Sequence, residues 1–414
     1  MKTIKITSLV LVLLAFLGLN SCSDKSLIEY KTTEMSEIFL SLDDIRNGYK
    51  AEAPKAIIEA GNIYVYGKYL FINDKYDGLH VVDNSNPSVP NFIAYLRIPG
   101  NSDVVIRNNY MYANSGPDLL ILDITNPTQV QLVKRVANAL FENEKSNEGN
   151  YLIGYGEKEI IEKYYINRGW DFQFGIQEDV QVSSSDNGSN RDGVGGSMAR
   201  FTLADNYLYF VNNSNLIPID LSNQIDPSIK TSVALGQGTI ETIYKYKEYL
   251  FVGSMNGVFI LDYKTNPSLP TIVSSVQHIR SCDPVVVQND IAFSTLSNFS
   301  RCGGGINELM VLDVTTAEKP KILAEYFMQT TPLGLGVIGN NLFVCQGKNG
   351  FTWYKTDKLT EILNNKVSED VNIHARDIIV IENNLIVTGD NGVIQYTYDT
   401  SNGSMTRVST LFSK

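Results

Sequence analysis

The stretch Gly78-Leu79-His80-Val81-Val82-Asp83-Asn84-Ser85-Asn86-Pro87 is a short apolar run that stops at an Asp and enters an Asn-Pro turn. The same pattern occurs again along the chain, in Asp118-Leu119-Leu120-Ile121-Leu122-Asp123-Ile124-Thr125-Asn126-Pro127 and in Gly257-Val258-Phe259-Ile260-Leu261-Asp262 followed by Asn266-Pro267. An apolar run of this length is too short for a helix, and Val and Ile favour strands. The repeat therefore predicts a strand that is covered on both faces.

The residues that end the run explain the turn. The Asp side chain can accept backbone N–H groups in the turn that follows it. Pro fixes its own φ and biases the Asn before it towards an extended conformation, so the chain has to change direction.

Successive copies can be aligned on the strand that precedes the Asp strand. A period near 42 residues with several strands per copy is typical of a β-propeller rather than a helical solenoid. The sequence thus predicts an all-β chain with one propeller of seven four-stranded blades, although six or eight blades also fit the pattern. The anchor residues, which are 41, 97, 42, 41, 51 and 43 positions apart, are Tyr69, Tyr110, Tyr207, Tyr249, Asp290, Asn341 and Asn384.

The first and last copies are complete. In the first we expect strands at Asn62–Tyr66, Tyr69–Asn73, Leu79–Asp83 and Phe92–Ile98, and Lys55–Ile58 could add a strand that helps to close the ring. In the last we expect Asp377–Ile381, Asn384–Thr388, Val393–Tyr398 and Thr406–Phe412. The step of 97 indicates an insertion in the second blade at residues 142–197, with a hairpin formed by Tyr151–Tyr155 and Ile160–Tyr165 and a polar flexible loop over Ser183–Gly193.

The N-terminus is typical of an exported protein. Lys2 and Lys5 precede the apolar run Ile6–Leu19, which has the length of a signal peptide rather than of a membrane span. Leu19-Asn20-Ser21-Cys22 resembles the cleavage box of bacterial lipoproteins, although Asn20 departs from it. The resemblance implies cleavage before Cys22, acylation of its thiol with chains such as palmitate, and a membrane anchor. The predicted organisation is a signal peptide at 1–21, a tether and lead-in segment at 22–54 and the propeller at 55–414.

Nearly the whole mature chain resembles the bacterial lipoproteins with LVIVD-type repeats that are common in Bacteroidetes. The resemblance implies an envelope β-propeller without a known enzymatic activity. It is carried by His80–Pro87, Ile98-Pro99-Gly100-Asn101, Gly195–Phe201, Cys282–Val287 and Pro332-Leu333-Gly334-Leu335-Gly336. The sixth copy departs from the pattern, because Gly350–Lys355 has no Asp at its end.

Composition and motifs limit the function. The 414 residues carry 34 basic and 45 acidic side chains, and the net charge of −11 disfavours nucleic acid as a partner. The chain contains no Gly-x-Ser-x-Gly, His-Glu-x-x-His or P-loop motif. We therefore predict no catalytic residue.

Three cysteines remain after Cys22. Cys282 and Cys302 enclose a long loop, and in an oxidising envelope a disulfide between them would contribute about 3 kcal/mol in the chain-entropy model. The hypothesis is a Cys282–Cys302 disulfide, with two free thiols as its alternative. Cys345 lies in an apolar strand and is interpreted as a core residue.

The alignment also predicts a ring of polar residues. Seven positions before each anchor, where an innermost strand begins, the side chains should meet around one mouth of the central channel. One reading is a site for a sugar or for a cation such as Ca²⁺; the other is a network of ion pairs and water that only lines the channel. The metal, if any, is left open, and Glu241, His374 and Arg376 are adjacent to the ring. Its members are Asn62, Asp103, Arg200, Thr242, Asp283 and Asp377, with Gly334 at the sixth position.

The sequence therefore favours a non-catalytic lipoprotein of the outer membrane that binds a glycan or an envelope protein at one face of the channel. Which side of the membrane it faces, periplasm or cell surface, is open. The alternative is a polysaccharide hydrolase or lyase that uses acidic residues of the ring as acid and base.

Overall fold

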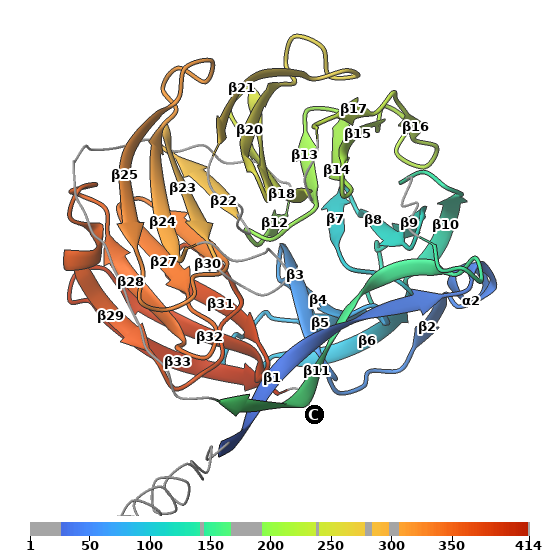
Figure 1. Cartoon of the computed structure of the whole chain (residues 1–414). Coiled ribbons are helices and arrows are strands. Elements are labelled where there is room, and N and C mark those ends of the chain that lie inside the picture. The colour runs from blue at the N-terminus through green and yellow to red at the C-terminus, as the bar shows by residue number, and fades with distance from the viewer. Residues whose placement is uncertain are drawn as a thin grey trace, which may run out of the picture. The chain divides into compact units, whose positions relative to one another are not determined.

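The computed structural model describes residues 26–140, 145–166, 193–236, 240–277, 284–297 and 306–412. The chain divides into two compact units, one of Met1–Ser36 with Tyr155–Gln177 and the other of Glu37–Gly154 with Glu178–Lys414. The second unit contains a β-propeller of seven blades built on four antiparallel strands each (Figure 1). The predicted fold class and blade number are confirmed.

The strands of each blade follow one another along the chain, from the axis outwards. Blades one and two contain β3 (Ala60–Tyr66), β4 (Tyr69–Asp74), β5 (Gly78–Asp83) and β6 (Asn91–Arg97), then β7 (Val104–Arg107), β8 (Tyr110–Ser115), β9 (Asp118–Asp123) and β10 (Gln131–Val136). Blade three contains β13 (Phe201–Ala204), β14 (Tyr207–Val211), β15 (Asn215–Asp220) and a broken outermost strand of β16 (Ser228–Ile229) and β17 (Val233–Ala234). Blade four contains β18 (Ile240–Tyr246), β19 (Tyr249–Ser254), β20 (Gly257–Asp262) and β21 (Thr271–Gln277).

Blades five to seven complete the ring. Blade five contains β22 (Val285–Gln288), β23 (Ile291–Leu296), β24 (Glu308–Asp313) and β25 (Lys321–Phe327). Blade six contains β26 (Leu335–Ile338), β27 (Asn341–Cys345), β28 (Phe351–Lys355) and β29 (Lys366–Asp370), with the 3₁₀ turn η2 (Ile362–Asn364) before its last strand. Blade seven contains β30 (Asp377–Ile381), β31 (Asn384–Gly389), β32 (Gly392–Asp399) and β33 (Ser404–Leu411), so the strands predicted for the first and last copies are found within two residues.

The two faces of the ring differ in their connections. On one face, which we call the turn face, every innermost strand joins the second strand through two residues, and at least one residue of each pair has a positive φ. Such turns match the twist of a hairpin and need Gly, Asn or Asp at that position in most cases. The pairs are Gly67-Lys68, Asn108-Asn109, Asp205-Asn206, Lys247-Glu248, Asn289-Asp290, Gly339-Asn340 and Glu382-Asn383.

The opposite face, which we call the mouth face, carries the connections between second and third strands and those from one blade to the next. These include the longest connections of the propeller: residues 137–200 between β10 and β13, and residues 297–307 between β23 and β24. Residues 141–144, 167–192 and 298–305 of these connections lie outside the described ranges. The mouth face therefore carries the two longest connections between propeller strands.

The Asp-turn of the repeat forms as predicted. Asp83 Oδ1 accepts hydrogen bonds from the N–H of Ser85 at 2.9 Å and from its hydroxyl, and the N–H of Ser88 donates to Asn86 Oδ1 at 3.1 Å. The hydrogen bonds from Lys68 and Ser85 lower the pKa of Asp83 to about 2. The same N–H contact from the residue two positions on occurs at Asp123, Asp220, Asp262, Asp313 and Asp399.

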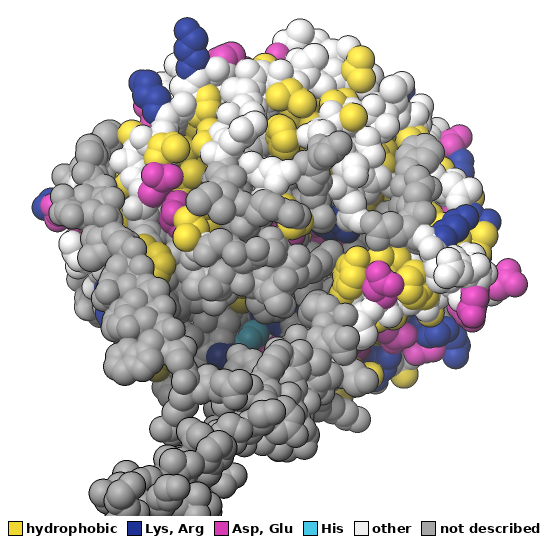
Figure 2. Space-filling view, in the orientation of Figure 1, with side chains coloured by type: hydrophobic (Ala, Val, Ile, Leu, Met, Phe, Trp, Pro, Cys, Tyr) yellow, Lys and Arg dark blue, Asp and Glu magenta, His cyan; other side chains and the backbone are white. Residues whose placement is uncertain are grey.

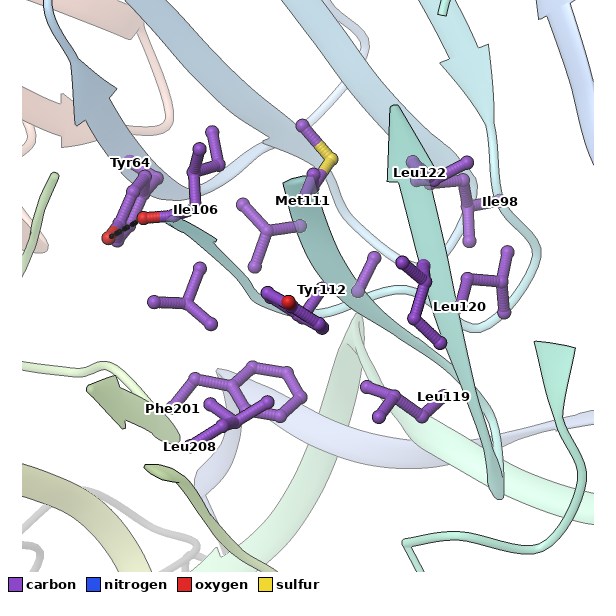
Figure 3. Packing of buried hydrophobic residues seen from close by; sticks show 14 of the residues in the cluster. Tyr64, Ile98, Ile106, Met111, Tyr112, Leu119, Leu120, Leu122, Phe201 and Leu208 are labelled. Atoms are coloured by element: carbon purple, nitrogen blue, oxygen red, sulfur yellow. Dashed lines mark hydrogen bonds between the residues drawn. The ribbon is translucent and has the colours of Figure 1, made fainter. Parts of the chain in front are cut away.

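The apolar third strands supply much of the core. In β5 and β9 every residue except the final Asp is buried. Figure 3 shows how Tyr112 and Leu119 of blade two lie towards Phe201 and Leu208 of blade three, while Tyr64 of blade one donates to the carbonyl of Ile106 at 3.4 Å. Blades one to three thus share one apolar cluster, and five further clusters lie between the other pairs of neighbouring blades, so the sheets are buried on both faces.

The ring closes between blades seven and one without exchange of a strand. Ile63 and Ile72 of blade one share an apolar cluster with Ile379 and Ile386 of blade seven. At this seam the side-chain amides of Asn84 and Gln395 exchange hydrogen bonds at 2.9 and 2.8 Å. The strand suggested for Lys55–Ile58 is absent; instead β2 (Lys50–Glu52) pairs with the outer edge of β6.

The outer edges of the blades are irregular. In six blades the outermost strand contains one extra residue opposite the third strand, and these bulges twist an edge strand and hinder its pairing with another chain. Several of the extra side chains turn back onto the blade clusters. The extra residues are Ile93, Val133, Val273, Leu323, Val367 and Val408.

The lead-in segment is ordered where it meets blade two. The helix α2 (Leu42–Asn47) begins at Ser41, whose hydroxyl accepts from Asp44 N–H. Arg46 donates twice to the buried carboxylate of Asp118, at 3.0 and 3.1 Å, and Arg135 lies 3.3 Å from it. Burial raises the pKa of Asp118, but the hydrogen bond from Arg46 and the charges of both arginines outweigh it and lower that pKa.

The insertion does not contain the predicted hairpin. Residues of both predicted arms belong to one strand, β11 (Tyr151–Ile166), and its partner is β1 (Ser26–Leu40) of the lead-in segment. The two form a separate two-stranded sheet, in which the Ser36 hydroxyl donates to the Gly156 carbonyl at 3.2 Å. Within the ranges given above, no helix has the length and hydropathy of a membrane span.

Candidate functional site

The end of the insertion runs into the middle of the ring. Residues 193–200, here called the hub segment, include β12 (Val194–Gly195), which pairs with the axis-facing side of β3 opposite Val65 and Tyr64 (Figure 1). An innermost strand of a propeller has no other strand between it and the axis. The hub segment therefore runs along the axis, with Val194 beside the turn-face end of β3 and residues 197–200 at the mouth face, where the sequence predicted a ring of polar residues.

Ser197 joins the hub segment to blades six and seven. Its hydroxyl donates to Asp377 Oδ1 at 2.8 Å and accepts from the N–H of Leu335 at 2.9 Å. The N–H of Met198 lies 3.4 Å from Asp377 Oδ2. Both oxygens of the Asp377 carboxylate thus accept hydrogen bonds from the hub segment.

Asp103, which precedes the first strand of blade two, also binds the hub segment through its carboxylate. Its Oδ2 accepts from the N–H groups of Arg200 and Phe201, at 2.7 and 3.1 Å, and its Oδ1 accepts from Val104 at 2.8 Å. The Ala199 carbonyl accepts from Ile243 of blade four at 2.9 Å. One short segment is therefore hydrogen-bonded to several blades at once.

Two glycines allow the close approach to Asp377. A Cβ at Gly196 would lie 1.9 Å from Asp377 Oδ2, and a Cβ at Gly334 would lie 2.2 Å from Asp377 Oδ1 and 2.8 Å from the Arg376 carbonyl. No side chain fits at either position without moving the carboxylate or the backbone. This explains, in physical terms, why Gly196 and Gly334 fill these places.

The two carboxylates are electrostatically unusual. Burial raises the pKa of Asp103 to about 6, even though hydrogen bonds from Arg200, Val104 and Phe201 and the charge of Arg200 oppose the shift. Burial likewise raises the pKa of Asp377 to about 6, opposed by the Ser197 hydroxyl and neighbouring N–H groups. Desolvation is the dominant cause in both cases.

The other predicted ring members lie around the same segment. The Asn62 amide donates to the Met198 carbonyl at 3.3 Å. Arg200 belongs to the hub segment itself, donates to Asn213 Oδ1 at 3.1 Å and lies with its guanidinium carbon 5.8 Å from the Phe210 ring centre. Thr242 is buried in β18, next to Ile243. The structure thus brings Asn62, Asp103, Arg200 and Asp377 together through the hub segment.

Several predicted residues lie outside the part of the chain that the structure describes. They are Asp283 of the ring, Cys22, and the pair Cys282 and Cys302. The lipidation and the disulfide therefore stay predictions. Cys345 is free and fully buried in a blade cluster, and burial raises the pKa of its thiol.

The sequence did not predict the side-chain amides that hydrogen-bond within the connection from blade one to blade two. Asn101 is fully buried, and its amide donates to the side-chain oxygen of Asn114 at 3.1 Å and to the Asp103 carbonyl at 3.0 Å. Asn73 donates to Asn101 Oδ1 at 2.9 Å. The signal was present in the repeat, since Asn73 and Asn114 occupy the same place in two copies.

This arrangement is well suited to hold backbone in place. All four carboxylate oxygens of Asp103 and Asp377 accept hydrogen bonds from the chain, and a cation would have to compete with those N–H and O–H donors. In the parts of the chain that the structure describes, no group of three His, Cys, Asp or Glu side chains is arranged to hold a metal ion. The geometry favours a structural role for Asp103 and Asp377, which hold the hub segment through backbone N–H groups and the Ser197 hydroxyl rather than through the expected ion pairs.

Comparison with known families identifies the repeat. LVIVD repeats are found at residues 59–95, 100–138, 195–234 and 238–278, in keeping with a family of β-propeller repeats. These stretches cover blades one to four. No curated protein matches the chain by sequence.

Solved structures resemble the chain in fold alone. The computationally designed protein Ika8 shares 9% identity and a TM-score of 0.51 over 82% of this chain and 84% of its own. The periplasmic gluconolactonase PpgL of Pseudomonas aeruginosa shares 10% identity and a TM-score of 0.51, over 86% of this chain and 97% of its own. BamB of Moraxella catarrhalis shares 12% identity over 88% of this chain and 97% of its own, with a TM-score of 0.48.

Proposed function

We propose that this chain is a non-catalytic binding protein of the bacterial cell envelope, held to the outer membrane by lipid on Cys22, and that its partner, a glycan or an envelope protein, binds the mouth face. The observation that carries the proposal is the position of the two longest connections. The turn face is built from two-residue hairpin turns and loops of four to ten residues, whereas the mouth face carries the connections at residues 137–200 and 297–307. Binding residues in rigid scaffolds are found preferentially on such connections.

The contacts of the hub segment support a binding function rather than hydrolysis at the centre of the ring. Residues 193–200 run along the axis, and their donors occupy Asp103 and Asp377, two of the three carboxylates of the predicted ring; the third, Asp283, lies outside the described residues. A general acid must reach the bond that it protonates, and Asp103 and Asp377 reach backbone N–H groups instead. This favours binding over the hydrolase or lyase alternative.

The mouth-face assignment can be tested by blocking one face at a time. Lys348→Cys places a thiol on an exposed residue of the mouth face, and Asn402→Cys places one on the turn face. Each thiol would be coupled to a polyethylene glycol chain on the full-length protein. Retention of glycans on an array and chemical crosslinking to envelope proteins would then be measured.

We expect the mouth-face conjugate to lose its partner and the turn-face conjugate to keep it. Loss of binding only in the turn-face conjugate would refute the assignment. The anchor has its own test: the Cys22→Ser protein should appear in the soluble fraction of the envelope. If Cys22→Ser protein stays with the membrane, the lipid anchor is wrong.

A further inference from the structure

A fixed cluster of polar side chains lies on the mouth face between blades six and seven. It consists of His374 and Arg376, from the connection between β29 and β30, and of Asp390, from the turn between β31 and β32. The exposed fractions of the three side chains are 16%, 25% and 49%. In Figure 2 a histidine side chain is visible beside basic side chains on the face shown.

The backbone around this cluster is tightly held. The N–H groups and carbonyls of Gly347 and Ala375 exchange two hydrogen bonds of 2.9 Å, which join the connection to blade six. A Cβ at Gly389 would lie 1.8 Å from the His374 carbonyl, so only glycine lets this strand pack against the connection. The Asn391 side chain accepts from His374 N–H at 2.9 Å. The cluster is thus built on rigid elements of two blades.

In this cluster the donors of Arg376 and His374 lie beside the carboxylate acceptor of Asp390. Arg376 Nε and Nη2 both donate to Asp390 Oδ1, at 3.1 and 2.8 Å, and His374 Nδ1 lies 3.5 Å from the same oxygen. Asp390 N–H points at His374 Nδ1 at 3.4 Å. A neutral imidazole that accepts on Nδ1 carries its hydrogen on Nε2, and the imidazolium carries one there too. Gly347 has a φ of +55° and packs beside the ring: a methyl group there would lie 3.7 Å from Nε2, an ordinary van der Waals contact.

We propose that His374, Arg376 and Asp390 form a saccharide-binding subsite, in which Asp390 accepts hydrogen bonds from sugar hydroxyls while Arg376 and His374 donate to hydroxyl or ring oxygens. A hydroxyl both donates and accepts, so neighbouring hydroxyls match a carboxylate placed beside a guanidinium and an imidazole. An acidic peptide would bring further acceptors against Asp390. The inference rests on the proposed function and specifies its partner as a glycan.

Affinity electrophoresis tests the subsite on the full-length protein. Native gels would contain dextran, pullulan, xylan, mannan, laminarin, pectin or alginate, and retardation would be compared among wild type, Asp390→Ala and Arg376→Ala. The control is Asp77→Asn, a partly exposed carboxylate on the mouth face of blade one that pairs with Lys55. Circular dichroism melts would show that each variant folds.

We expect at least one polysaccharide to retard the wild type and Asp77→Asn equally. Asp390→Ala and Arg376→Ala should bind it about tenfold more weakly, as expected for the loss of one charge-assisted hydrogen bond. Retardation that both variants keep in full, or no retardation in any gel, would overturn the subsite. Binding of a poly-glutamate peptide that depends on Arg376 would assign the cluster to acidic proteins and also overturn it. If no polysaccharide binds but the mouth-face conjugate still loses a protein partner, the proposed function stands and only the subsite falls.

Discussion

Replacing Asp377 with Asn removes a buried negative charge from the hub while keeping the shape of the side chain. Burial raises the pKa of Asp377 to about 6 from an ordinary value of 3.8. Each pKa unit corresponds to about 1.4 kcal/mol, so ionisation of Asp377 at neutral pH lowers the free energy of unfolding by about 3 kcal/mol. Asn does not ionise, and its cost in hydrogen bonding to Ser197 and Met198 does not depend on pH.

The direction in which the stability changes with pH follows from proton binding at Asp377. Between pH 4 and pH 6 the folded wild type binds a proton at Asp377 that the unfolded chain releases, so this group contributes stability at low pH that is lost as pH rises through about 6. The free energy of unfolding of Asp377→Asn minus that of wild type should therefore rise by about 2 kcal/mol from pH 4 to pH 7.

Urea unfolding followed by circular dichroism at several pH values measures this difference. Asp399→Asn is the control, because Asp399 lies in a turn-face loop and its pKa is lowered by hydrogen bonds from Ser401. Its difference from wild type should stay nearly constant over the same range. A constant difference for Asp377→Asn as well would refute the burial of an ionised carboxylate at the hub.

Three further predictions concern the ring and its loops. Gly334→Ala should destabilise the propeller by about 1–3 kcal/mol, because its Cβ would overlap Asp377 and the Arg376 carbonyl; unchanged urea midpoints would contradict the close packing. Gln395→Ala should lower the free energy of unfolding by about 1–2 kcal/mol, because it removes the amide pair between Gln395 of blade seven and Asn84 of blade one. The double variant with Asn84→Ala should lose less free energy of unfolding than the sum of the two single variants, and additive losses in this double-mutant cycle would argue against the pair. Non-reducing peptide mapping should recover Cys282 joined to Cys302, whereas alkylation of both without reductant would exclude the disulfide.

The sequence was sufficient for the repeating part of the fold. Each copy contains an apolar third strand, an Asp and a turn, and these local features agree with one another at Asp83, Asp123 and Asp262. Strand bounds in the first and last blades follow from such local patterns. The period near 42 residues then specifies the architecture.

The insertion could not be predicted in the same way, because its pairing is not local. Tyr151–Ile166 has the pattern of a strand, but nothing in that pattern names Ser26–Leu40 as its partner. Likewise the alignment placed Asp103 and Asp377 at one mouth of the channel, but not Ser197, which comes from the insertion and donates a hydrogen bond to Asp377. Three-dimensional contacts between distant segments decided both cases.

The cluster between blades six and seven was also only partly visible in the sequence. His374 and Arg376 were adjacent to an aligned ring position, whereas Asp390 lies in a turn that has no counterpart of the same length in every blade. Its contact with Arg376 depends on the antiparallel pairing of β30 with β31. A single sequence does not reveal which turn residue faces which connection.

Hydrogen–deuterium exchange of the full-length protein, with and without the polysaccharide that retards it most, tests the central claim directly. The claim is that a glycan binds the mouth face at the cluster of His374, Arg376 and Asp390. We predict slower exchange on binding in the connection at residues 371–376 and in the turn at residues 389–391, with no change in the two-residue turns of the opposite face. Protection confined to the turn face, or absent from both mouth-face segments, would contradict the account.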